Sequence, residues 1–90
     1  MNIRLLSLDL LDDPPVAMRE DADEQMMQEL ADSIRAVGLL QPIVVRPRGD
    51  RFEIIAGWRR SRACRLAGMF APPCNVVDVT DDVVEAMKMA

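Results

Sequence analysis

The 90-residue chain contains no histidine and no tyrosine, and it has only two cysteines, Cys64 and Cys74. Without histidine it cannot form the Ser-His or Cys-His pairs that activate a nucleophile, and it lacks imidazole metal ligands. The two cysteines do not have CxxC spacing, so we expect free, partly buried thiols rather than a disulfide or a metal site. Any chemistry would therefore depend on Arg, Asp, Glu, Ser or a metal bound with a nucleotide.

Long apolar runs are also missing. No segment approaches the roughly 18 apolar residues of a transmembrane helix, and Met1 is not followed by a signal-peptide pattern. Half of the residues are hydrophobic and 29% are charged, which is typical of a folded globular domain. We therefore expect a single cytoplasmic domain that spans residues 1–90.

Positive charge is concentrated in one part of a chain whose net charge is -4, a balance that argues against a general nucleic-acid coat. Seven arginines lie between residues 46 and 68, against only Asp50 and Glu53: Arg46, Arg48, Arg51, Arg59, Arg60, Arg62 and Arg65. This cluster fits a phosphate site, and it equally fits a solvated basic face paired with acidic neighbours. Charge alone does not decide between these two interpretations.

The hydrophobic pattern predicts an α+β domain. Four segments have the pattern of strands: 3–8, 43–46, 51–56 and 75–79. Three segments have helical periodicity or boundaries: 23–37, 58–67 and the residues from 82 to the C-terminus. We expect an acidic, Pro-rich loop over 9–22, and a hairpin turn at Gly49 and Asp50 that leaves Pro47 at a strand end.

Residues at the helix boundaries support this assignment. Asp21 or Asp23 can cap the helix predicted over 23–37, and Gly38 can end it in the left-handed conformation. Asp81 or Asp82 can cap the final helix in the same way.

The segment from Ile54 to Arg62 has the pattern of a buried strand, a glycine and then a helix. The unpaired amides and the positive dipole end of such a helix attract anions, and Gly57 would let a phosphate approach the backbone. Arg59 and Arg60 add donors suited to phosphate oxygens. Arginine is unfavourable in a first helical turn unless an anion is bound, so the pattern favours a phosphate site. The segment is neither a Walker A loop nor a GxGxxG fingerprint.

The residues around this turn resemble the N-terminal domains of the ParB family. Residues 30–34, Gly38 and residues 41–46 resemble the first motif of that family, and residues 52–63 resemble the second, which is commonly written GERR followed by an Arg-Ala pair. The match runs in order and spacing over residues 3–90. It implies a ParB/sulfiredoxin-like α+β fold, with a small mixed sheet, a β-hairpin and about three packed helices.

The resemblance also implies a function. Such a domain binds CTP with Mg²⁺ in a DNA partition or plasmid-regulator protein, and nucleotide binding lets two copies close as a clamp on DNA. The implied partners are a second copy, DNA that a domain beyond this chain reads, and a partition ATPase, with no membrane partner. The chain would then be a fragment of a longer cytoplasmic protein associated with the nucleoid or a plasmid.

The resemblance assigns residues to the nucleotide site, but it assigns no metal ligand, and no catalytic residue is identified. Six residues of the turn would contact the nucleotide and its phosphates: Gly57, Trp58, Arg59, Arg60, Ser61 and Arg62. Five further residues would flank the nucleotide: Arg19, Gly38, Gln41, Pro42 and Arg46.

Trp58 departs from the family pattern, because it stands where the family has a glutamate associated with metal handling and hydrolysis. CTP hydrolysis therefore stays open, and the family's third motif would begin only after Ala90. Sulfiredoxin chemistry needs a cysteine in this turn, so we do not expect a sulfiredoxin. A ParB-like nuclease or nucleotidase, and a nucleotide-free domain that binds DNA or protein, are the alternatives. Trp58 itself either packs over the domain edge, which we favour, or stacks on a base or a partner.

Overall fold

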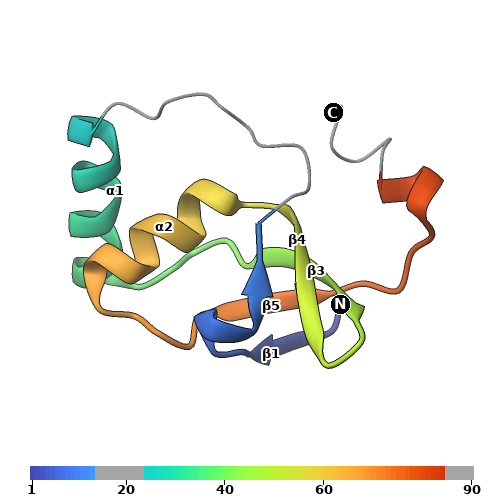
Figure 1. Ribbon diagram of the computed structural model, residues 1–90. Helices are drawn as coiled ribbons and strands as arrows, with labels where there is room; N and C mark the ends of the chain where they lie inside the picture. The colour runs from blue at the N-terminus through green and yellow to red at the C-terminus, as the bar shows by residue number, and fades with distance from the viewer. Residues whose placement is uncertain (14–23, 85–90) are drawn as a thin grey trace.

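The computed structural model describes residues 1–13 and 24–84, which form a mixed five-stranded sheet and two main helices (Figure 1). The elements in chain order are β1 (Ile3–Leu5), the 3₁₀ helix η1 (Leu8–Leu10), β2 (Leu11–Asp12), α1 (Glu24–Val37), β3 (Ile43–Arg48), β4 (Arg51–Ala56), α2 (Trp58–Ala67) and β5 (Pro73–Val76). Residues 81–84 are helical as well. The predicted α+β class is confirmed.

The strands lie in the order β1-β5-β3-β4-β2. The hairpin of β3 and β4 is antiparallel, and β5 returns parallel to β3 on its other side. The outer strands are β1, which is antiparallel to β5, and β2, which is parallel to β4. In Figure 1, α1 and α2 lie together on one side of the molecule, and α2 leads directly out of β4.

The strands at the edges differ from those predicted. The first is shorter, because β1 ends at Leu5 and a 3₁₀ turn follows within the predicted strand 3–8. Two residues of the predicted loop form β2, whose register joins Leu11 to Phe52. The last strand starts two residues earlier than predicted, at Pro73, and ends three residues earlier, at Val76; a proline is acceptable as the first residue of a strand.

The hairpin and both main helices are confirmed, with small corrections at their ends. Pro47 lies inside β3 opposite Phe52, but β5 pairs only with residues 43–45, so a second strand does not flank this position. At the final helix, the Thr80 carbonyl accepts from the Val84 amide at 3.0 Å, which puts Thr80, rather than the predicted Asp81 or Asp82, at the N-cap position. The predicted caps Asp21 and Asp23 lie outside the described residues.

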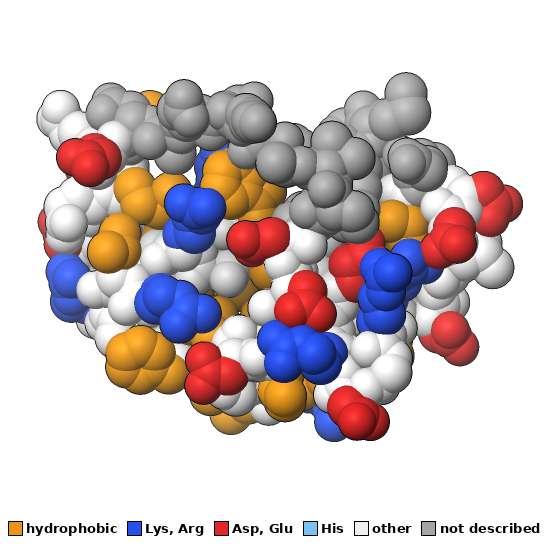
Figure 2. All heavy atoms as spheres, viewed as in Figure 1, with side chains coloured by type: hydrophobic (Ala, Val, Ile, Leu, Met, Phe, Trp, Pro, Cys, Tyr) orange, Lys and Arg blue, Asp and Glu red, His pale blue; other side chains and the backbone are white. Residues whose placement is uncertain are grey.

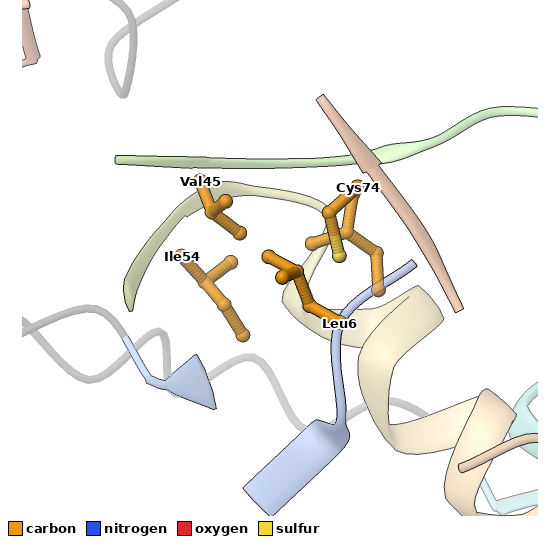
Figure 3. Packing of buried hydrophobic residues seen from close by; sticks show 5 residues of the cluster. Leu6, Val45, Ile54 and Cys74 are labelled. Carbon is orange, nitrogen blue, oxygen red and sulfur yellow. The ribbon is translucent and has the colours of Figure 1, made fainter. Parts of the chain in front are cut away.

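Two buried clusters hold the layers together. The sheet cluster consists of Leu6, Ile43, Val45, Ile54 and Cys74. Figure 3 shows the side chains of Leu6, Val45, Ile54 and Cys74 pointing toward one another. The helix cluster consists of Leu8, Ala31, Ile34, Ala63 and Cys64, and it packs α1 against α2. Each cluster takes one leucine from the segment after β1. Trp58 of α2 packs against the sheet cluster, and Ala63 and Cys64 of α2 belong to the helix cluster, so α2 contacts both clusters. Within the described part of the chain, no helix combines the length and apolarity needed to cross a bilayer.

Both cysteines are free, as predicted, and both are fully rather than partly buried. Burial raises the pKa of the Cys74 thiol from its ordinary value of 9.0 to about 11, and it raises the pKa of the Cys64 thiol as well. A thiolate is therefore more favourable in the unfolded chain than in the fold. The folded state consequently loses stability as the pH rises from 9.0 toward about 11.

We expect both thiols to react with a thiol-specific reagent only when the domain opens. In the native protein at about pH 8, modification should be many times slower than for a free thiol, and it should become fast in denaturant. Absorbance of the released leaving group measures both rates. Rapid modification of either cysteine in the native protein would contradict the burial described above.

Candidate nucleotide-phosphate site

Gly57 is the only residue between β4 and α2, and its conformation demands glycine. Its φ is 99°, in the left-handed region that a residue with a side chain rarely adopts. A Cβ at this position would lie 3.4 Å from the Ile43 Cα and 3.5 Å from a guanidinium nitrogen of Arg60. The chain therefore turns from strand to helix at a point where the Gly57 backbone lies close to β3 and to the Arg60 guanidinium.

The start of α2 is the positive end of the helix dipole. Gly57 is the N-cap and offers no side-chain acceptor, and the first turn of α2 contains no acidic residue. The Ser61 amide closes the first turn by donating to the Gly57 carbonyl at 3.0 Å, so the amides before it have no acceptor within the helix. Unpaired amides and the helix dipole together attract an anion at this position.

Arg60 connects this turn to the segment after α1. Its guanidinium donates to Gln41 Oε1, which brings Gln41 and the adjoining Pro42 to the same end of the sheet as Gly57. Gln41 is exposed and Pro42 is half-buried. Residues from two separate segments of the chain, around 41–42 and 57–60, therefore meet at one surface site.

Trp58 is half-buried and packs against the sheet cluster. Two exposed arginines of α2 lie over its indole: the Cζ atom of Arg59 is 5.7 Å from the ring centroid, and that of Arg62 is 5.2 Å away. The packing role that the sequence favoured for Trp58 is thus present. The ring also carries two cation–π contacts that the sequence analysis did not anticipate.

The remaining predicted site residues lie at different places. Ser61 is buried in α2, at 8% exposure. Gly38 ends α1 with a φ of 83°, as predicted, and precedes Gln41 by three residues. Arg19 lies outside the described residues. Their contact with a nucleotide stays a prediction.

Arg46 belongs to a separate ion network on the hairpin. Its guanidinium donates to Glu53 Oε1 at 3.1 and 3.3 Å, pairs with Asp81 Oδ1 at 2.7 Å, and reaches the Val79 carbonyl at 3.4 Å. Arg48 also contacts Glu53 Oε1, at 3.1 Å. Asp81 and then Glu53 raise the pKa of Arg46 above its ordinary value. The described contacts thus engage Arg46 in this network rather than at the Gly57 turn.

Sequence reasoning missed the role of Glu53, which is 2% exposed. The signal was present, because Glu53 interrupts the apolar strand from Phe52 to Ile55, and a buried carboxylate in a strand must be paired. In the hairpin register, Glu53 lies directly opposite Arg46. A hairpin prediction that had been carried to its register would have found this pair.

The basic cluster therefore divides into two parts. Arg46, Arg48 and Arg51 pair with acidic residues of the hairpin and its neighbours, as a solvated basic face would. Arg59, Arg60 and Arg62 belong to the first half of α2, where Arg59 and Arg62 contact Trp58 and Arg60 contacts Gln41. On the face that Figure 2 shows, basic and acidic side chains are interspersed and do not form one continuous basic patch.

The residues of the turn fit a polyphosphate better than they fit a metal ion. Among residues 1–13 and 24–84 there is no group of three or more His, Cys, Asp or Glu side chains that could hold a metal. Mg²⁺ is usually held by one or two carboxylates together with substrate phosphates and water. Since the first turn of α2 has no carboxylate, Mg²⁺ at this turn would take its ligands from the phosphates and from water.

A mixed sheet whose hairpin runs through a single glycine into an arginine-rich helix defines a small α+β domain with an anion-binding turn. Comparison with known proteins identifies the family. The ParB N-terminal domain family matches residues 1–90, and the chain belongs to it.

Curated relatives that the chain resembles include chromosome-partitioning proteins. The chain is 42% identical over 87 residues to the probable chromosome-partitioning protein ParB of Coxiella burnetii, and 49% identical over 76 residues to Spo0J of Thermus thermophilus. These matches cover 97% and 84% of this chain, but only 30% and 28% of the relatives. The chain thus spans less than a third of the length of these curated relatives.

Solved structures extend the comparison to the fold. A truncated ParB from Caulobacter crescentus in complex with CTP-γ-S has a TM-score of 0.88 and 33% identity, over 99% of this chain and 51% of that one. The same protein bound to the centromeric parS site has a TM-score of 0.76 and 36% identity, over 91% and 44%. Sulfiredoxin from Arabidopsis thaliana has a TM-score of 0.80 and 26% identity, over 97% of both chains. The predicted ParB/sulfiredoxin-like fold is confirmed.

Proposed function

We propose that this domain binds CTP, with Mg²⁺ carried on the phosphates, at the turn formed by Gly57, Arg59 and Arg60. In the full-length protein, nucleotide binding then gates the closure of two copies around DNA during chromosome or plasmid partition. The observation that supports the proposal is the Gly57 turn, where the positive end of the α2 dipole coincides with arginines and with a first helical turn that contains no acidic residue.

The likeness to the Caulobacter protein supports CTP as the ligand. That protein was crystallised with CTP-γ-S, and its likeness extends over 99% of this chain. The turn provides what a triphosphate requires, which is backbone amides at a helix start and guanidinium groups that match phosphate oxygens. Cys64 and Cys74 are fully buried, and burial raises the pKa of both thiols, which does not suit a catalytic thiolate.

In this proposal, DNA is bound by a region of the full-length protein other than this domain. The Caulobacter relative binds the parS site, and this domain itself has a net charge of -4. A chain with this charge is a poor general DNA coat, so its role is to respond to nucleotide and to control the position of a DNA-reading region. Hydrolysis is not part of the proposal, because Trp58 occupies the position of the family's glutamate.

The first test is calorimetric titration of the chain, and of the full-length protein, with CTP, ATP, GTP and UTP in the presence of Mg²⁺. We expect selective CTP binding that weakens by about tenfold or more in Arg60→Ala, because charge-assisted hydrogen bonds to phosphate are lost. Arg65→Ala is the matched control, since it removes the same charge from the last turn of the same helix. It should change the affinity by about twofold at most.

Two outcomes would reject the proposal. One is the absence of binding by both proteins, which would direct the search to a DNA or protein ligand for this domain. The other is an equal loss of affinity in Arg60→Ala and Arg65→Ala, which would indicate general charge attraction. Clamp gating has its own test, in which sedimentation of the full-length protein on parS-type DNA should change when CTP is added.

A further inference from the structure

The indole ring of Trp58 makes cation–π contacts with Arg59 and Arg62 of the same helix. They follow it in the sequence at positions i+1 and i+4, and their Cζ atoms lie 5.7 and 5.2 Å from the ring centroid. The indole is half-buried and anchored on the sheet cluster, whereas both arginines are exposed. A rigid, anchored ring therefore supports two long side chains at the start of the helix.

We propose that Trp58 is a positioning residue of the phosphate site, which holds Arg59 and Arg62 ready for the phosphates of a nucleoside triphosphate. This inference rests on the proposed function and deepens it. An exposed arginine loses rotamer freedom when it binds a ligand, and this loss weakens binding. A cation–π contact that exists before binding removes part of that loss.

An indole suits this task in a way that a carboxylate does not. A glutamate beside two arginines would accept their hydrogen bonds and neutralise their charge, so it would compete with phosphate for the same donors. The indole has no acceptor atom, so it orients a guanidinium without occupying its N–H groups. Trp58 therefore adds no acceptor that would compete with phosphate for the guanidinium donors of Arg59 and Arg62.

Two variants distinguish the effect of the aromatic ring of Trp58 from the effect of its packing against the sheet cluster. Trp58→Leu keeps an apolar side chain against the sheet cluster but removes the aromatic face, whereas Trp58→Phe keeps a ring. In calorimetric titration with CTP and Mg²⁺, we expect Trp58→Leu to bind about five- to tenfold more weakly, and Trp58→Phe to stay within about threefold of the wild type. Thermal unfolding checks that both variants are folded at the temperature of the titration.

A double-mutant cycle tests whether Trp58 acts through the arginines. The measured quantity is the logarithm of the affinity for CTP. In an Arg62→Gln background, Trp58→Leu should lower it by about half as much as in the wild type, because one of the two cation–π contacts is already absent. In an Arg65→Gln background, the effect of Trp58→Leu should be unchanged. An equal effect of Trp58→Leu in all backgrounds, or equal binding by the Phe and Leu variants, would overturn the inference.

A measurement without nucleotide distinguishes this inference from the proposed function. In the ligand-free protein, the side-chain NMR signals of Arg62 should be displaced upfield by the indole ring current, and they should return to ordinary positions in Trp58→Leu. Ordinary positions in the wild type would refute the positioning role, whether or not CTP binds. If the displacement is present and CTP does not bind, the proposed function fails while the contact stands. If CTP binds equally to wild type and Trp58→Leu, only the positioning role fails.

Discussion

Replacing Glu53 with leucine is expected to lower the free energy of unfolding by on the order of 3 kcal/mol. Glu53 is 2% exposed and accepts hydrogen bonds from Arg46 and Arg48 at 3.1 Å. Its removal leaves the Arg46 guanidinium, whose side chain is 16% exposed, without the carboxylate that faces it inside the hairpin. A small domain has only about 5–15 kcal/mol in total, so equilibrium urea unfolding should detect the change readily.

The pair between Arg51 and Asp12 provides the control for Glu53. It has a similar separation of 2.9 Å, but its side chains are 49% and 46% exposed. Arg51→Met should therefore change the urea midpoint little, because water and side-chain entropy offset most of an exposed ion pair. The double variant Arg46→Met with Glu53→Leu should recover much of the lost stability, since an apolar pair can replace a buried ion pair. A midpoint for Glu53→Leu as close to wild type as that of Arg51→Met would show that the network is not structural.

Glu53 also has a consequence beyond the hairpin, because its partner Arg46 holds the segment that leads into the final helix. Arg46 contacts the Val79 carbonyl and Asp81, and the Val77 amide donates to the Val45 carbonyl at 2.9 Å. These contacts fix residues 77–81 against the end of β3. Loss of the carboxylate should therefore loosen the C-terminal segment before it unfolds the sheet, and amide exchange at Val77 would report this loosening.

The helices and the hairpin could be predicted because their signals are local. The apolar stripe of α1, the turn at Gly49 and Asp50, and the glycines at both ends of α2 each lie within a few residues of the element they define. The edge strand β1 was predicted, although too long, whereas the other edge strand, β2, could not be predicted in this way. β2 has two residues, and its position depends on pairing with Phe52, about forty residues away in the chain.

The same distinction applies to the candidate site. Gly57, Arg59 and Arg60 were predicted from one continuous segment, because a strand, a glycine and a helix start are enough to create an anion-binding turn. The contact of Arg60 with Gln41 joins two segments through the tertiary fold, and only the resemblance to the ParB family suggested that Gln41 is near. The described partners of Arg46 are Glu53, Asp81 and Val79, and its place beside the nucleotide stays a prediction.

Gly57→Ala is expected to have the largest effect on ligand binding. The φ of 99° is strained for alanine, and a left-handed or similarly rare conformation costs about 1–3 kcal/mol of stability. The new methyl group would itself fit, at 3.4 Å from the Ile43 Cα, so the cost comes from the backbone conformation, and relief of that strain would displace the turn. A displaced turn should weaken binding of CTP with Mg²⁺ by about tenfold or more in calorimetry.

Gly68→Ala is the control for Gly57→Ala, because it introduces similar backbone strain without altering the phosphate site. Gly68 ends the same helix with a φ of 82°, and a Cβ there would have no atom within 4 Å. Both variants should therefore lose stability, but only Gly57→Ala should lose affinity when each is measured well below its unfolding temperature. A similar loss of affinity in both would mean that weak binding follows from general destabilisation. Retention of affinity by Gly57→Ala would place the phosphate away from this turn, because a ligand seated on the first amides of α2 cannot tolerate a displaced Gly57 backbone.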